Sequence, residues 1–172
     1  MEQKKHTELR LNMAKEKIVK TNAMRILERE KISYEFRSYE CDEFIDGQAT
    51  ADKLGLAHEE VYKTLVTIAH SKKYYVFVIP IDAELDMKKA AKAVGEKSVE
   101  MIHVKEITNV TGYVRGGCTA IGMKKQYDTV IDSSALQFEK IHVSAGKIGA
   151  QITLSPEDLA RAARAKFAEI IV

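Results

Sequence analysis

The sequence is poor in several residue types, and each scarcity narrows the class of protein. It has no tryptophan and only 7% aromatic residues, which argues against a broad surface for stacking nucleic-acid bases. No apolar run approaches the roughly 20 residues that span a bilayer, and the charged N-terminus lacks the apolar core of a secretory signal. The two cysteines, Cys41 and Cys118, allow one disulfide at most. We therefore expect a reduced, cytoplasmic protein without membrane attachment.

The positive charge of the chain is concentrated near its N-terminus. Residues 1–20 contain six cations and three anions, so the formal charge of +2 for the whole chain leaves −1 for residues 21–172. A domain that binds many phosphates along a nucleic acid is usually strongly basic. We therefore predict a basic N-terminal extension over residues 1–20 and one domain over residues 21–172, with any nucleic-acid contact local and assisted by a partner protein.

Apolar patterns and punctuation residues predict many short helices and strands. Helices are expected over residues 22–30, 49–54, 87–94, 104–110 and 156–165. Strands are expected over residues 33–39, 61–68, 74–81, 129–132, 141–144, 151–154 and 167–172. Asp86 and Ser155 are suitable N-caps, and Pro156 suits a first helical position. Because helices and strands interleave irregularly, we expect an α/β (mixed α+β) fold with a mixed sheet surrounded by helices.

A cationic, glycine-rich segment stands out at residues 111–125, which contain four glycines and three cations. Gly116 and Gly117 permit positive φ and the close approach of a ligand to backbone N–H groups. The segment matches neither the P-loop nor the dinucleotide fingerprint. It is interpreted either as an oxyanion-binding loop or, as is commoner for paired glycines, as a sharp turn.

Two further positions carry polar groups where apolar ones are expected. Lys63 and Thr64 interrupt the apolar run of residues 61–66, so the lysine is either a pocket cation or a side chain whose ammonium reaches solvent. Ser144 follows a predicted strand and either bonds a substrate or forms a turn, because no nucleophile-elbow pattern surrounds it.

Cys118 lies beside the paired glycines and raises the question of a thiolate nucleophile. Such chemistry needs an activating base, and the five histidines are scattered along the chain, so a packed cysteine is the favoured interpretation. No cysteine or histidine spacing is typical of zinc, and the acidic residues Asp42, Glu43 and Asp46 are interpreted as a solvated loop. We therefore expect no metal and no cofactor.

Taken together, seven short motifs resemble the YbaK/EbsC family of aminoacyl-tRNA editing domains. The resemblance runs in order from about Thr21 to Ile170. The motifs are Val61-Tyr62-Lys63-Thr64-Leu65, Leu85-Asp86-Met87-Lys88-Lys89, Val99-Glu100-Met101, Thr111-Gly112-Tyr113, Gly116-Gly117, Ile121-Gly122-Met123-Lys124-Lys125 and Val143-Ser144-Ala145-Gly146.

The resemblance implies a YbaK-like, partly barrel-like sheet and the hydrolysis of mischarged Cys-tRNA(Pro). It implies that the cysteinyl thiol of the substrate attacks its own ester, with neither a metal nor a protein nucleophile. It also implies that the protein works with prolyl-tRNA synthetase, and we expect a monomer. The residues implied as catalytic are Lys63 and Gly116, and those implied as substrate-binding are Tyr39, Thr64, Gly117, Cys118 and Ser144.

Two residues depart from the family pattern. Ala120 stands where the family loop usually has proline, which frees φ at that position. Gln151 stands where several relatives have an acid, so a carboxylate contribution cannot be carried over. Two alternatives therefore remain open: a deacylase for Ala-tRNA or Ser-tRNA, and a non-catalytic module that binds tRNA or the synthetase.

Overall fold

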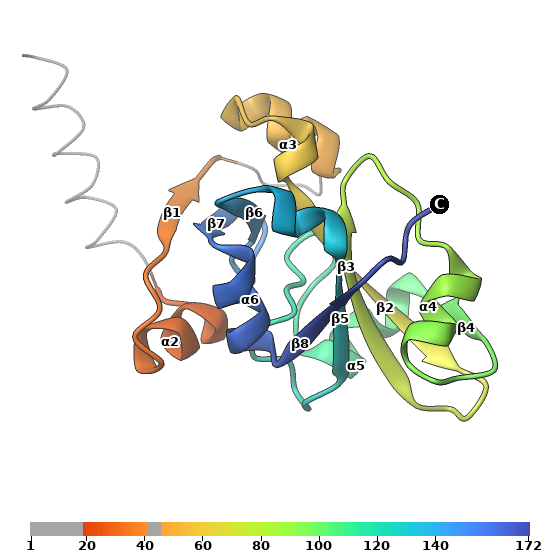
Figure 1. Cartoon of the computed structure of the whole chain (residues 1–172). Helices are drawn as coiled ribbons and strands as arrows, with labels where there is room; N and C mark the ends of the chain where they lie inside the picture. Colours follow the sequence, from red (N-terminus) through yellow and green to blue (C-terminus); the bar gives the residue numbers. More distant parts are fainter. Residues whose placement is uncertain (1–18, 41–45) are drawn as a thin grey trace, which may run out of the picture.

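The structure, a computed structural model, describes residues 19–40 and 46–172 (Figure 1). These residues form five α-helices and eight strands. The helices are α2 (Asn22–Arg29), α3 (Gly47–Leu54), α4 (Met87–Ala93), α5 (Ile107–Thr111) and α6 (Pro156–Ala163). The strands are β1 (Glu35–Ser38), β2 (Tyr62–Ala69), β3 (Tyr74–Pro80), β4 (Val99–Met101), β5 (Asp128–Asp132), β6 (Ile141–Ser144), β7 (Ala150–Leu154) and β8 (Ala165–Ala168).

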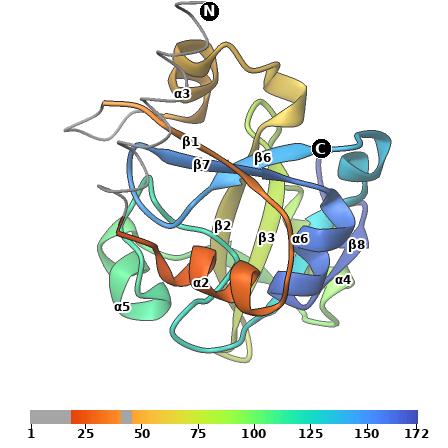
Figure 2. The same cartoon turned by 90° about the vertical axis from the view of Figure 1, so that its left-hand side faces the viewer.

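The strands form two sheets. An antiparallel sheet has the order β1-β7-β6, and a mixed sheet has the order β4-β2-β3-β5-β8. A single parallel bridge between Val61 and His142 joins the start of β2 to β6. Helix α3 lies at one end of the molecule, well apart from α5 (Figures 1 and 2). The predicted mixed α+β fold is confirmed.

Strand β3 is buried on both faces, which explains its uninterrupted apolar sequence. Val76 and Val78 pack into the main core, which lies between the two sheets and includes residues of α2 and α6. Phe77 and Ile79 point the other way and pack in a second cluster with residues of α4. The central strand therefore forms the common wall of two hydrophobic cores.

The C-terminal prediction is wrong in its boundaries. Helix α6 ends at Ala163, because Arg164 adopts a left-handed conformation with φ 53°. The chain then pairs at once with β5, in parallel, as β8. The predicted strand 167–172 therefore begins two residues too late, and the predicted helix 156–165 extends two residues too far.

Two other elements differ from expectation. The predicted helix over residues 104–110 is a 3₁₀ turn, Val104–Glu106, followed by the short helix α5. Strand β4 was not predicted, because three residues are too few to show a pattern. Most of the predicted basic extension, together with Cys41, Asp42 and Glu43, lies outside the described residues.

Candidate active site

A row of polar residues crosses the three-stranded sheet. Gln151 of β7 pairs with Arg37 of β1 on one side and with Ser144 of β6 on the other. The neighbouring residues Ile152 and Val143 belong to the main core, so this row occupies the opposite face of the sheet. Gln151 is 8% exposed, and its Oε1 has no hydrogen-bond partner among the described residues. Arg37 is exposed and Ser144 is partly exposed, so only the middle of the row is buried. A polar face with a buried, unsatisfied acceptor is better suited to a binding site than to a core.

The row continues onto β2 through the bridge between the sheets. Val61 and His142 pair in parallel, and Lys63 and Ser144 follow two residues later on their respective strands. The bridge therefore brings the start of β2, which carries Lys63, near the end of β6, which carries Ser144, although the two residues are not themselves paired. Two predicted site residues, far apart in the sequence, thus lie on strands that come together where the two sheets join.

Lys63 is half-buried and hydrogen-bonded. Its Nζ donates to the carbonyl oxygen of Ile81 at 3.1 Å. Burial lowers the pKa of this ammonium, whereas the carboxylates of Asp82 and Glu84 act in the opposite direction. The side chain therefore bends towards the turn after β3, and its partial desolvation strengthens its attraction for any nearby negative charge.

Helix α3 closes this side of the site. The side-chain amide of Gln48 donates to the same Ile81 carbonyl at 3.0 Å. Gly47 lies so near Ile81 that an added Cβ would stand 2.7 Å from its Cγ2. The N-terminus of α3 is therefore held on the turn that also anchors Lys63.

Tyr39 lies between the end of β1 and α3. Its backbone N–H donates to the carbonyl of Gly149 at 2.8 Å, and its hydroxyl is 3.4 Å from Oγ1 of Thr50. The ammonium of Lys53 is 5.6 Å from the centre of the tyrosine ring. The structure thus holds the tyrosine by its backbone and by two residues of α3.

The two paired glycines differ in their surroundings. Gly116 is exposed with φ 83°, whereas Gly117 is buried against the backbone of residues 147–148. The Gly117 N–H donates to the carbonyl of Val114 at 3.0 Å, closing a turn. No backbone hydrogen bond within the described residues uses the Gly116 N–H. Of the two amides, only that of Gly116 is available to a ligand.

Ser144 has a local turn role. Its Oγ accepts a hydrogen bond from the N–H of Gly146 at 3.2 Å, and Gly146 has φ 102°. The neighbouring His142 is engaged elsewhere, because its Nδ1 lies 2.6 Å from Oγ1 of Thr153. This arrangement agrees with the turn interpretation, and no hydrogen bond among the described residues joins the serine to a base that could activate it as a nucleophile.

Of the predicted site residues, Cys118 and Thr64 have surroundings that fit a binding or catalytic role least well. Burial raises the pKa of the Cys118 thiol to about 11, so the thiol is protonated near neutral pH. Thr64 follows Lys63 on β2, and alternation along the strand directs its side chain to the opposite face. The packed interpretation of Cys118 therefore fits the structure, and the structure does not bring the Thr64 side chain alongside Lys63.

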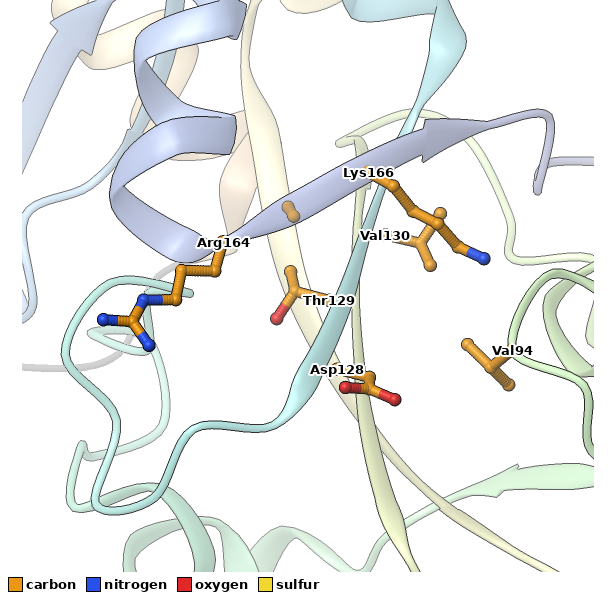
Figure 3. Close-up of a pocket in the computed structure, with 7 residues that line it drawn as sticks. Val94, Asp128, Thr129, Val130, Arg164 and Lys166 are labelled. Atoms are coloured by element: carbon orange, nitrogen blue, oxygen red, sulfur yellow. The ribbon is translucent and has the colours of Figure 1, made fainter.

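The described part of the chain contains no group of three or more acidic, histidine or cysteine residues suited to a metal ion. None of the described helices is long and apolar enough to cross a membrane. A cavity of about 340 Å³ lies elsewhere, along β5 and β8, and contains none of the predicted site residues (Figure 3). Its lining residues are Val94, Asp128, Thr129, Val130, Arg164, Ala165 and Lys166.

Three residues near Lys63 were not singled out from the sequence: Gln48, His58 and Asp82. His58 lies between two carboxylates, with its Nδ1 3.0 Å from Oδ2 of Asp82 and its Nε2 2.7 Å from Oδ1 of Asp52. No local motif marks these positions, because each contact joins segments that only the fold brings together. The sequence offers one local clue to the position of Gln48: Asp46 is the N-cap of α3, which places Gln48 in the first turn of that helix.

The chain belongs to the aminoacyl-tRNA editing domain family, whose sequence profile matches residues 46–162. It is 46% identical over 160 residues to a protein of Enterococcus faecalis (strain ATCC 700802 / V583) named as a candidate Cys-tRNA(Pro)/Cys-tRNA(Cys) deacylase, EbsC. That alignment covers 92% of this chain and 98% of the relative. The family and the class of enzyme expected from the sequence are thus confirmed.

Solved structures show the same fold. A candidate trans-editing enzyme for prolyl-tRNA synthetase superposes with a TM-score of 0.76, covering 90% of this chain and 99% of that one at 19% identity. The hypothetical protein APE2540 superposes with a TM-score of 0.80, covering 88% of this chain and all of that one at 22% identity. The expected YbaK-like fold is therefore confirmed.

Proposed function

We propose that this chain is a trans-editing deacylase that hydrolyses mischarged Cys-tRNA(Pro). The carrying observation is the half-buried ammonium of Lys63, which donates to the Ile81 carbonyl on one side of the junction of the two sheets, next to the bridge that joins β2 to the strand of Ser144. A cation in a partly desolvated site stabilises the oxyanion that develops when an ester carbonyl is attacked. The similarity to EbsC supports cysteine as the amino acid.

In the proposed reaction, the substrate supplies its own nucleophile. The cysteinyl sulfur forms a bond to the ester carbonyl carbon, the bond to the ribose oxygen breaks, and the thiol proton ends on that oxygen through solvent. The products are free tRNA and a cyclic cysteine thioester, which water opens. Lys63 and the Gly116 N–H would stabilise the oxyanion, and Tyr39 and Ser144 would orient the terminal adenosine or the amino acid.

Several features support this chemistry over a protein nucleophile. The Cys118 thiol has a raised pKa, and the Ser144 hydroxyl accepts a turn hydrogen bond and is bonded to no base among the described residues. Prolyl-tRNA synthetase is the proposed partner, because the near-neutral charge of residues 21–172 suits a domain that borrows another protein's grip on tRNA. A cytoplasmic monomer is proposed with it.

The deciding experiment is a panel of mischarged tRNAs incubated with the purified protein. Deacylation of Cys-tRNA(Pro), with little action on Ser-tRNA or Ala-tRNA, supports the proposal. Equal cleavage of the seryl and alanyl esters would refute the thiol mechanism and favour the broader deacylase. Binding to tRNA or to the synthetase without any deacylation would instead favour the non-catalytic module.

A further inference from the structure

His58 is bonded in a way that requires it to carry a proton on both ring nitrogens. Oδ2 of Asp82 lies 3.0 Å from its Nδ1, and Oδ1 of Asp52 lies 2.7 Å from its Nε2. A neutral imidazole has one N–H and can donate to only one of these carboxylates. Both bonds together need the imidazolium, and the hydrogen bonds to Asp52 and then to Asp82 raise the pKa of His58 accordingly.

Asp82 connects this histidine to Lys63. It directly follows Ile81, whose carbonyl oxygen accepts the hydrogen bond from the Lys63 ammonium. The Asp82 carboxylate attracts that ammonium and raises its pKa, as does Glu84, against the effect of burial. An uncompensated Asp82 would therefore compete with a substrate oxyanion for the positive charge of Lys63.

We propose that His58 is a positioning residue for Lys63: its imidazolium neutralises Asp82 and so leaves the lysine ammonium available to the aminoacyl ester. This inference rests on the proposed function. The remaining charged groups close to the arrangement are Asp52 of α3, Glu59 and Glu60 beside His58 on the 3₁₀ turn His58–Glu60, and Glu84 after Asp82. Among the residues that the structure describes, only Asp52 and Asp82 bond the ring, so protonation of His58 acts chiefly on these two carboxylates.

A purely mechanical role for the same contacts makes a different prediction. The chain of Asp52, His58 and Asp82 also ties α3 to the turn after β3, where Gln48 donates to Ile81. If the tie alone matters, removing Asp82 must harm the site as much as removing His58. If the charge of Asp82 matters, removing it must repair the loss of His58.

The test is a double-mutant cycle on kcat/KM for Cys-tRNA(Pro). His58→Ala is expected to lower kcat/KM about threefold to fivefold, mainly through kcat, the range typical of exposed charge pairs. Asp82→Asn in the His58→Ala background is expected to restore the wild-type value. His70→Ala, at an exposed histidine in the turn after β2, is the matched control and should leave kcat/KM unchanged. Thermal melts confirm that each variant is folded.

A second readout does not depend on activity. NMR titration of isotope-labelled lysine side chains should show the pKa of Lys63 rising in His58→Ala and returning in the double variant. A wild type that deacylates tRNA but whose activity is unchanged in His58→Ala, or is not rescued by Asp82→Asn, overturns the inference. If the wild type cleaves no mischarged tRNA, the proposed function fails, and an unchanged Lys63 titration then overturns the electrostatic link as well.

Discussion

Gly117 lies against the backbone of Lys147: a Cβ added to the glycine would stand 2.8 Å from the Cα of that lysine. No real Cβ is found so close to a backbone atom, so the two loops could accommodate a side chain only by separating. The loop that contains Gly116 and Gly117 thus packs directly against the turn after β6. Its shape depends on the absence of one methyl group.

Gly117→Ala is therefore expected to destabilise the protein by about 1–3 kcal/mol, the usual cost of forcing extra volume into a packed region. It should also lower deacylation, because the Gly116 amide moves with the loop. Chemical denaturation and kcat/KM check the two effects. Gly95→Ala is the control: it has a positive φ of 70° but open space around it, so only the backbone cost of about 1 kcal/mol applies and activity is retained. Normal stability and activity in Gly117→Ala would contradict the loop contact.

Lys63→Ala is expected to reduce kcat for Cys-tRNA(Pro) about 100-fold or more, the typical cost of losing one group that stabilises an oxyanion. The side chain is only half-buried, so the melting temperature should change little. Single-turnover deacylation measures the chemical step directly. Lys88→Ala, an exposed lysine on α4, removes the same charge elsewhere and should have no effect. Retention of full activity in Lys63→Ala would remove this lysine from the site.

His142 predicts a loss of stability on acidification. Burial lowers its pKa below the ordinary value, with a further lowering from Arg37, while Glu60 and Glu35 partly oppose this. Below the unfolded pKa of about 6.5 the unfolded chain binds the proton more readily, so stability falls as the pH drops towards the folded pKa. Melting temperatures of the wild type and of His142→Asn, measured from about pH 5 to about pH 8, check this. The wild type should lose more stability than the variant at the acidic end of this range. Parallel curves would show that His142 does not titrate on unfolding.

Cys118→Ala is expected to keep deacylation within about twofold of wild type, because a thiol with a raised pKa supplies no nucleophile near neutral pH. The same burial predicts slow reaction with thiol reagents until the protein is unfolded. Cys118→Ser provides the comparison, since it replaces the thiol by a polar hydroxyl in a half-buried position. A large loss of activity in the alanine variant, with the serine variant active, would point to a direct chemical role for this side chain.

Much of the fold could be predicted from local patterns. The caps at Asp86 and Ser155 and the apolar runs of β2 and β3 each determine an element without outside help. The start of β8 could not be predicted, because it depends on Arg164 adopting a conformation that usually marks glycine. Local sequence gives no sign that an arginine will adopt this conformation.

Some residues of the candidate site could likewise be predicted from the sequence, and others could not. Lys63 and Gly116 could be proposed because a cation in an apolar run and paired glycines are unusual where they stand. Gln48 and His58 could not, because a glutamine early in a helix and a histidine before a strand are ordinary. Their importance arises only when the fold brings them to the turn that contains Ile81.

The anchor of Lys63 has a consequence for selectivity. Within the described part of the chain, its ammonium is held by a backbone carbonyl rather than by a direct ion pair. A lysine bound to a carboxylate would have to break that pair before meeting an incoming oxygen, whereas this one retains charge that its immediate neighbour does not cancel. A neutral ester carbonyl gains little from such a group, but an oxyanion gains much more. The Lys63 ammonium of the free protein is thereby ready to stabilise the negative charge that develops on the carbonyl oxygen only when the ester is attacked.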